Sequence, residues 1–247
     1  MSEPTRKATR FHWFILVILM TGSGSSWTDI PTERQAMLDA VRESVRGSAE
    51  YTGRSELSEN VMGAMAAVAR EEFVLPQYRH LAYQNTPLPI AAGQTISQPL
   101  IVALMTELLD PQPEDVVLEV GTGSGYQAAV LAHLVEHVYS VEIVEELADS
   151  ASEALRRLDY TNVTVRAGDG YAGWPEHAPF DGIIVTAAAE KLPPPLLQQL
   201  KPGGKLVIPL GEEHGFQELL LIEVDAAGEI SKQSILPVRF VPLTREQ

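Results

Sequence analysis

The sequence predicts an α/β fold built on an open, mostly parallel sheet, and three observations support this. The apolar run Val116–Val120 is typical of a buried strand, and the glycines after it lead into a helix-like segment. Strand-like and helix-like segments then alternate, which is the pattern of parallel strands joined by crossover helices. A second strand, 138–143, carries an acid near its end, Glu142, 21 residues after Gly121.

The segments before the sheet are expected to be helical, with one irregular loop. Helices are predicted over 32–46 and 59–69, the second with Ser58 as its N-cap. Residues 79–99 lack regular periodicity, and long irregular loops within compact domains are often functional. Pro99 then opens a further helix, because proline is favoured in the first helical turn.

The sheet region has a regular order of predicted elements. Strands are expected near 116–120, 138–143, 162–166, 181–186 and 205–209, and helices near 124–135, 145–158 and 193–200. Two further strand-like runs, 218–224 and 235–243, flank a hairpin turn at 226–229. The mostly parallel sheet is therefore expected to include an antiparallel strand.

Composition excludes several classes of function. The chain of 247 residues has no cysteine, which excludes disulfides, thiolate zinc sites and a cysteine nucleophile. Its formal net charge is −15, and no basic run offsets it. Because phosphate backbones repel such a chain, nucleic acid is not expected as a partner.

Residues 1–26 have the pattern of a secretory signal. Three basic residues precede the apolar run Phe11–Met20, which is short for a membrane span, and small polar residues follow. A small-residue cleavage motif is missing and His12 interrupts the run, so an extension from an upstream start codon is the alternative. Without residues 1–26 the formal net charge becomes −17, so the acidic character belongs to the rest of the chain.

The glycine turn after the first sheet strand indicates a nucleoside site. Its spacing is Gly-x-Gly-x-Gly, whereas dinucleotide-binding proteins have Gly-x-Gly-x-x-Gly. A turn without a pyrophosphate to bind suits a nucleoside with an amino-acid tail, such as S-adenosylmethionine. Glu142 is expected to accept hydrogen bonds from both ribose hydroxyls. Asp169 and Gly170, after the third strand, are expected near the adenine amine, although Asp-Gly also favours simple turns.

Glu119 precedes the glycines within the strand, where a buried acid is costly unless it is hydrogen-bonded. Two roles are open for it: bonds to the glycine-loop amides, or a water-mediated contact with the cationic end of the cofactor. His133 and His137 have i, i+4 spacing, but no third ligand is evident, so surface or capping roles are expected and no metal site.

If the nucleoside is S-adenosylmethionine, a methyl donor, the segment after the fourth strand indicates which class of group accepts the methyl. Residues 185–190 lack the Asn/Asp-Pro-Pro-aromatic motif of methyltransferases that act on amino groups. No Lys/Asp/His cluster is evident for deprotonating a phenol. The acceptor is therefore expected to be ionised already at neutral pH, which fits a carboxylate with a pKa of about 4.

From about residue 33 to its end, the sequence resembles the protein-L-isoaspartate O-methyltransferase family. The most specific block is the Gln-Thr-Ile-Ser stretch at 94–97, which is not a general methyltransferase feature. The resemblance is carried by these segments: Gly93-Gln-Thr-Ile-Ser-Gln-Pro99, Val117–Tyr126, Gly168-Asp-Gly170, Pro179–Ala188, Gly203-Gly204, Gly211–His214 and Val238–Leu243.

The resemblance implies a Rossmann-like S-adenosylmethionine-dependent methyltransferase fold with an N-terminal helical cap. It implies a single domain over 27–247, with the cap and active-site loop in 27–110 and the cofactor-binding sheet in 111–247. The implied reaction is methyl esterification of the free α-carboxylate of L-isoaspartyl residues in damaged proteins and peptides. The ester then closes to a succinimide, whose hydrolysis returns some normal aspartyl linkage.

The family pattern also implies the site residues. Ser97 corresponds to the active-site hydroxyl, and Thr244 to a family position near the C-terminus. The expected cofactor contacts are Thr95, Ile96, Ser97, Glu119, Gly121, Gly123, Gly125, Glu142, Asp169 and Gly170. The expected substrate contacts are Ala82, Ile90 and Arg239. Two positions depart from many members, Asn85 for aspartate and Ala91 for glycine, and both changes are expected to be tolerated.

Two alternatives stay open: a small-molecule carboxyl methyltransferase on the same fold, and a cofactor-binding homologue without catalysis. Isoaspartyl proteins and peptides are the expected partners, without stable membrane association, and a monomer is expected. Cofactor supply favours the cytoplasm, whereas the leader-like segment 1–26 favours export to the periplasm or the medium.

Overall fold

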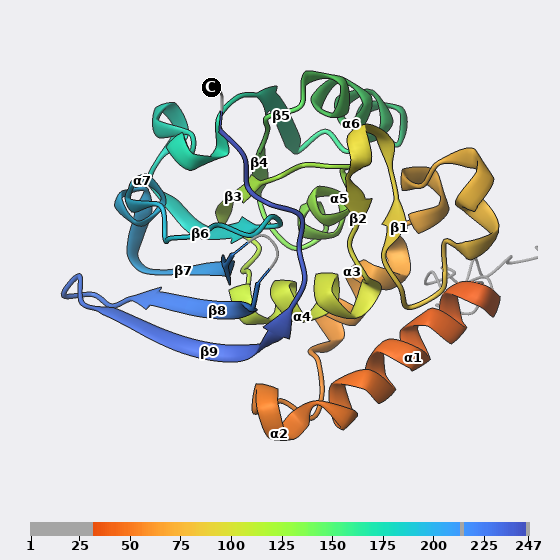
Figure 1. Cartoon of the computed structure of the whole chain (residues 1–247), viewed down its shortest axis with the longest axis horizontal. Helices are drawn as coiled ribbons and strands as arrows, with labels where there is room; N and C mark the ends of the chain where they lie inside the picture. The colour runs from red at the N-terminus through yellow and green to blue at the C-terminus, as the bar shows by residue number, and fades with distance from the viewer. Residues whose placement is uncertain (1–31, 213–214, 246–247) are drawn as a thin grey trace, which may run out of the picture. The chain divides into compact units, whose positions relative to one another are not determined.

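One central sheet of seven strands organises the chain, in the order β5-β4-β3-β6-β7-β8-β9 (Figure 1). The computed structural model describes residues 32–212 and 215–245, so the predicted leader, 1–26, lies outside the described residues. The strands are β3 Val116–Val120, β4 His137–Glu142, β5 Val163–Ala167, β6 Phe180–Val185, β7 Leu200–Gly211, β8 Gln217–Val224 and β9 Ile230–Val238. The five strands β3, β4, β5, β6 and β7 are parallel, and β8 and β9 extend the sheet as antiparallel strands.

Helices pack on both the sheet and one another. The α-helices are α1 Thr32–Gly47, α2 Ala49–Thr52, α3 Glu59–Ala67, α4 Pro99–Leu109, α5 Tyr126–Ala132, α6 Glu145–Arg157 and α7 Pro194–Gln198. The 3₁₀ helices are η2 Arg70–Phe73, η3 Pro76–Leu81, η4 Ala91–Gly93, η5 Gly170–Ala172 and η6 Pro175–His177. Helix α4 packs on β6 and β7, α6 packs on β4 and β5, and α1 and α3 pack on α4. No helix of the described ranges is long and apolar enough to cross a membrane.

Local sequence signals account for the helix positions. Helix α1 buries one apolar face, with Met37 and Val41 at most 1% exposed. Ser58 caps α3, because its hydroxyl accepts a hydrogen bond from the backbone N–H of Val61 at 3.3 Å. Pro99 is the first residue of α4, as predicted.

The C-terminal region differs from the prediction. The edge strand β9 begins at Ile230 and not at residue 235, because the tight turn after Asp225 returns the chain directly to β8. The Asp225 carboxylate accepts hydrogen bonds from the N–H groups of Ala227 and Glu229, both at 2.8 Å. Strand β9 ends at Val238, and the chain then crosses toward the segment that follows β6.

The loop predicted at 79–99 contains a short hairpin. Strand β1, Leu88–Pro89, pairs antiparallel with β2, Thr95–Ile96. The turn between them holds Ala92 at φ 53° and Gly93 at φ 69°. The positive φ falls at Ala92 and Gly93 and not at Ala91, which explains why alanine is compatible with position 91.

Ala92→Gly is expected to raise the free energy of unfolding by about 0.5–1 kcal/mol, because alanine is strained at positive φ. Ala91→Gly is the matched control and is expected to lower it by a similar amount, because glycine only adds freedom to the unfolded chain there. Urea unfolding of both variants measures the difference. Equal effects at the two positions would contradict the strained turn.

Candidate active site

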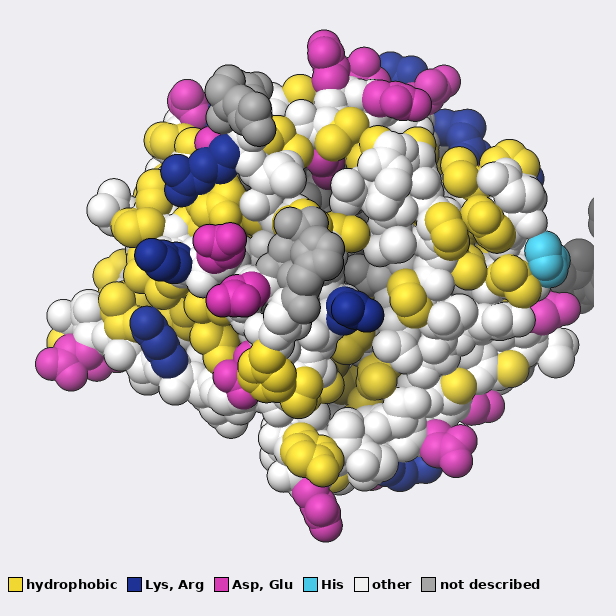
Figure 2. All heavy atoms as spheres, viewed as in Figure 1, with side chains coloured by type: hydrophobic (Ala, Val, Ile, Leu, Met, Phe, Trp, Pro, Cys, Tyr) yellow, Lys and Arg dark blue, Asp and Glu magenta, His cyan; other side chains and the backbone are white. Residues whose placement is uncertain are grey.

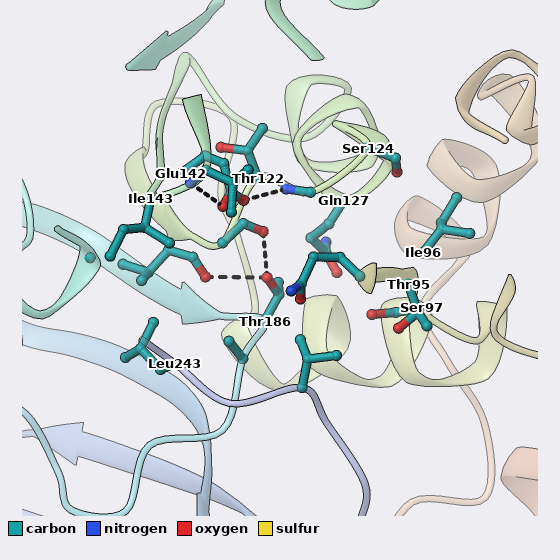
Figure 3. A pocket seen from close by; sticks show the side chains of 18 of the residues that line it. Thr95, Ile96, Ser97, Thr122, Ser124, Gln127, Glu142, Ile143, Thr186 and Leu243 are labelled. Atoms are coloured by element: carbon teal, nitrogen blue, oxygen red, sulfur yellow. Dashed lines mark hydrogen bonds between the residues drawn. The ribbon is translucent and has the colours of Figure 1, made fainter. Parts of the chain in front are cut away.

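A pocket opens at the carboxyl ends of β3, β4 and β6, where open α/β sheets bind their ligands (Figure 3). About 760 Å³ of empty space lies among its lining residues, including space open to solvent. The lining residues are Gln94–Ser97, Val102, Val120–Ser124, Tyr126, Gln127, Val141–Val144, Gly170, Thr186, Ala187 and Val241–Thr244. The pocket is therefore built from the glycine loop, two strand ends, the β2 hairpin and the C-terminal segment.

The glycine loop lies against the end of β6. Gly121 has φ 96°, and a Cβ atom there would come within 2.5 Å of Thr186 Oγ1. The Thr186 hydroxyl contacts the backbone oxygens of Val120 and Gly121. Only glycine combines this φ with this close approach, so the turn has a structural reason for its first glycine.

Glu142 reaches the pocket from the end of β4. Its two carboxylate oxygens accept hydrogen bonds from the N–H of Gly123 at 2.8 Å and of Val144 at 3.0 Å (Figure 3). Each carboxylate oxygen has two acceptor sites, so one on each oxygen stays free for a ligand. The two backbone bonds fix the carboxylate beside the glycine loop.

Glu119 does not line the pocket. It is fully buried in β3 and accepts a hydrogen bond from the Ser140 hydroxyl, which is 2.6 Å from the hydroxyl of Thr122. Burial raises the pKa of Glu119 from 4.5 to about 8, and the nearby charge of Glu142 adds to the shift. The chain of hydroxyls, and not a direct contact, joins this acid to the glycine loop.

Glu119 makes the free energy of unfolding depend on pH. Between pH 4.5 and about 8 the folded protein keeps a proton that the unfolded chain has released, so stability falls as the pH rises. The slope reaches at most about 1.4 kcal/mol per pH unit. In urea unfolding from pH 5 to 8, Glu119→Gln is expected to lose less stability than the wild type. The exposed Glu114→Gln is the control, and wild-type behaviour of Glu119→Gln would contradict the assignment.

Thr95 and Ser97 stand between the pocket and a second space. A groove beside the pocket has about 1040 Å³ of empty space, including its open mouth. Four residues line both the pocket and the groove: Thr95, Ser97, Thr186 and Val241. The other walls of the groove are Pro87, Gln98, Leu100, Ile101 and Leu236–Phe240. Arg239 belongs to this groove and is exposed, whereas Ile96, the last residue of β2, is buried and lines only the pocket.

Besides Glu119, four predicted site residues lie outside both spaces. Ala82 is fully buried, and Ile90 packs near Gly123 in a smaller neighbouring cavity. Gly125 is the N-cap of α5 and packs against side chains of α6. Asp169 caps η5 by accepting a hydrogen bond from the Tyr171 N–H at 2.9 Å, so the adjoining Gly170 is the residue at the pocket wall.

Arg70 links the 82–86 segment to the pocket. Its guanidinium is fully buried, donates to the backbone oxygen of Ala82 at 2.8 Å, and lies 4.8 Å from the ring centre of Tyr126. Burial lowers the pKa of Arg70. Because Tyr126 lines the pocket, Arg70 positions the 82–86 segment relative to helix α5.

The sequence did not identify several lining residues. Thr186 follows β6 at the same sheet edge as Glu142, so the rule that strand ends carry ligands could have indicated it. Gln127 has no such signal, because its orientation depends on α4, which is distant in sequence. Thr244 does line the pocket, as its family position suggested.

His133 and His137, for which no metal site was expected, contact neighbouring side chains. His133 meets the Tyr160 ring edge-on at 5.7 Å, and His137 Nε2 lies 2.9 Å from Thr164 Oγ1. Burial lowers the pKa of both. Within the described part of the chain, no group of three or more candidate metal-ligating side chains occurs.

Comparison with known proteins assigns the chain to a family. Residues 49–247 match the family model described as protein-L-isoaspartate(D-aspartate) O-methyltransferase (PCMT). Protein-L-isoaspartate O-methyltransferase 2 of Syntrophobacter fumaroxidans is 54% identical over 97% of this chain and 98% of the relative. A Polaromonas protein of the same name is 54% identical over 85% of this chain and its own full length.

A solved structure agrees with this assignment. A Plasmodium falciparum protein, described as a beta-aspartate methyltransferase (PCMT) in complex with S-adenosyl-L-homocysteine, superposes with a TM-score of 0.71. It is 26% identical, and the match covers 86% of this chain and 99% of that one. The chain belongs to the protein-L-isoaspartate (D-aspartate) O-methyltransferase family, whose members are S-adenosylmethionine-dependent enzymes of Rossmann-like fold.

Proposed function

We propose that the pocket holds S-adenosylmethionine and that the adjoining groove holds the L-isoaspartyl residue of a damaged protein. One observation carries this arrangement: Thr95, Ser97 and Thr186 line both spaces. A methyl donor in one space and an acceptor in the other would therefore meet at Ser97.

The polar and apolar groups that line the pocket fit a nucleoside. The free acceptor sites of Glu142 suit a ribose diol, because a carboxylate offers two oxygens to two hydroxyls. The backbone at Gly170 and the side chains of Ile143 and Leu243 form a largely apolar wall beside it, which suits the adenine ring. Gly170 can have no side chain here, since a Cβ atom would lie 2.4 Å from Val120.

The chain's own residues have to align and desolvate the acceptor. When bound, S-adenosylmethionine supplies a methyl group on a sulfonium sulfur. Among the described residues, no lysine, histidine or aspartate lines the pocket or the groove. A carboxylate acceptor needs no general base, so this lining suits isoaspartate. The Ser97 hydroxyl is placed to donate a hydrogen bond to the acceptor carboxylate and orient it.

The groove fits an extended peptide. A repair enzyme has to accept many sequences, which favours recognition through backbone contacts. The Leu236–Val241 segment supplies one wall and residues 97–101 the other. The exposed Arg239 lines this groove, so its guanidinium is available to pair with a carboxylate bound there.

The function is tested with two synthetic peptides that differ only in one linkage, isoaspartyl or normal α-aspartyl. Methyl transfer from radiolabelled S-adenosylmethionine is expected to the isoaspartyl peptide alone. Equal transfer to both peptides, or transfer only to small carboxylic acids, would favour the small-molecule alternative. Cofactor binding without any transfer would favour a catalytically inactive homologue.

Location and assembly are further proposals. We infer a cytoplasmic enzyme, because its methyl donor is made there, and N-terminal sequencing of the mature protein would reveal removal of residues 1–26. On the face in Figure 2, acidic and basic side chains are interspersed, and the described residues form no continuous basic patch there. This distribution and the net charge of −15 support the absence of a nucleic-acid partner.

A monomer is expected in size-exclusion chromatography with light scattering.

A further inference from the structure

Gln127 has an amide whose orientation the structure fixes. It is the second residue of α5, is 6% exposed, and its Nε2 atom lies 2.9 Å from Thr106 Oγ1 on α4. The Thr106 hydroxyl donates its one hydrogen to the backbone oxygen of Val102 at 2.8 Å. Thr106 Oγ1 can therefore only accept, so the Gln127 amide nitrogen has to be the atom that faces it.

The carbonyl oxygen of Gln127 is consequently left for the pocket. No described residue donates a hydrogen bond to this oxygen. The oxygen is also not one of the fully buried side-chain atoms that lack a hydrogen-bond partner. Figure 3 shows Gln127 between the glycine loop, which carries Thr122, and the segment Thr95–Ser97. A nearly buried acceptor that opens only onto a pocket calls for a donor from the ligand.

The amino-acid tail of the methyl donor has such a donor. Glu142 is the single carboxylate among the described lining residues, and it lies at the nucleoside end of the pocket. Glu119, the acid expected near the cationic tail, is hydrogen-bonded by Ser140 outside the pocket. The α-ammonium therefore needs a neutral acceptor between the glycine loop and Ser97.

We propose that Gln127 Oε1 accepts a hydrogen bond from the α-ammonium of the cofactor's amino-acid tail. Thr106 is the positioning residue that keeps this oxygen, and not the amide nitrogen, toward the ligand. This inference rests on the assignment of the pocket to S-adenosylmethionine. It makes Gln127 a determinant of specificity for the amino group of the tail.

Calorimetry with two ligands tests the contact. The ligands are S-adenosylhomocysteine and its analogue with hydrogen in place of the α-amino group. Gln127→Met keeps the length of the side chain and removes the acceptor, and it is expected to bind S-adenosylhomocysteine about tenfold more weakly. Its affinity for the deaminated analogue is expected to match the wild type within twofold. Thr106→Val is expected to weaken S-adenosylhomocysteine about threefold, because the amide can then turn.

Gln112→Met, on an exposed loop, is the control for the substitution itself, and circular dichroism confirms that each variant is folded. An equal loss for both ligands in Gln127→Met would overturn the inference. A raised KM for the isoaspartyl peptide with unchanged ligand affinity would also overturn it, because the oxygen would then serve the substrate. If the wild type bound neither ligand, the pocket assignment would fail and this inference with it.

Discussion

Glu142→Ala is expected to weaken S-adenosylhomocysteine binding by about 100-fold or more. The wild-type carboxylate is fixed by the N–H groups of Gly123 and Val144, with one acceptor site free on each oxygen. Two charge-assisted hydrogen bonds to the ribose contribute about 1.5 kcal/mol or more each, which corresponds to this factor. Isothermal titration calorimetry measures the dissociation constant directly.

Glu142→Gln separates ligand contact from loop anchoring. The amide keeps one oxygen for a backbone N–H or a ribose hydroxyl, so an intermediate loss of affinity is expected. Glu146→Ala, an exposed acid on the following helix, is the matched control and should leave affinity unchanged. A loss of less than threefold in Glu142→Ala would mean that the nucleoside does not lie against this strand end.

Ser97→Ala is expected to lower kcat for methyl transfer by about 100-fold, with S-adenosylhomocysteine affinity within twofold of the wild type. Ser97 lines both the pocket and the groove, so its hydroxyl can orient the acceptor carboxylate where the two spaces meet. A misplaced acceptor carboxylate lowers the rate of methyl transfer strongly, because in-line transfer depends on the alignment of the acceptor oxygen with the methyl group. Single-turnover kinetics with an isoaspartyl peptide measures the transfer step.

Ser231→Ala, exposed on β9 and away from the groove, controls for loss of a serine hydroxyl. A large loss of cofactor affinity in Ser97→Ala would contradict its assignment to the acceptor. An unchanged kcat would show that the hydroxyl does not contact the reacting carboxylate.

Features set by local sequence were predictable. The strands β3 to β6 begin and end within one residue of the expected positions, because buried apolar runs between turn residues leave little choice of register. The glycine loop and Glu142 were found for the same reason: each lies at the carboxyl end of a strand, at the same edge of the sheet. Ser97 was identified only through the family pattern, and the short hairpin of β1 and β2 that precedes it was not predicted, because this segment has no periodic signal.

Features set by contacts between distant segments were not predictable. Glu119 precedes the glycines in sequence, yet its carboxyl group turns to Ser140 on the neighbouring strand. In the sequence Gln127 is an ordinary helix residue, and only its contact with Thr106 in the folded protein fixes the orientation of its amide. Ala82 lies in the predicted loop, but its backbone oxygen accepts a hydrogen bond from the buried Arg70 guanidinium, so it contributes to loop position and not to the groove surface.

The most direct test is a crystal structure of the protein with S-adenosylhomocysteine and an isoaspartyl peptide. It is expected to show the ribose hydroxyls on Glu142 and the cofactor sulfur facing the groove. The isoaspartyl α-carboxylate is expected within hydrogen-bond distance of the Ser97 hydroxyl. A nucleoside bound away from the glycine loop, or an isoaspartyl carboxylate remote from Ser97, would contradict the account.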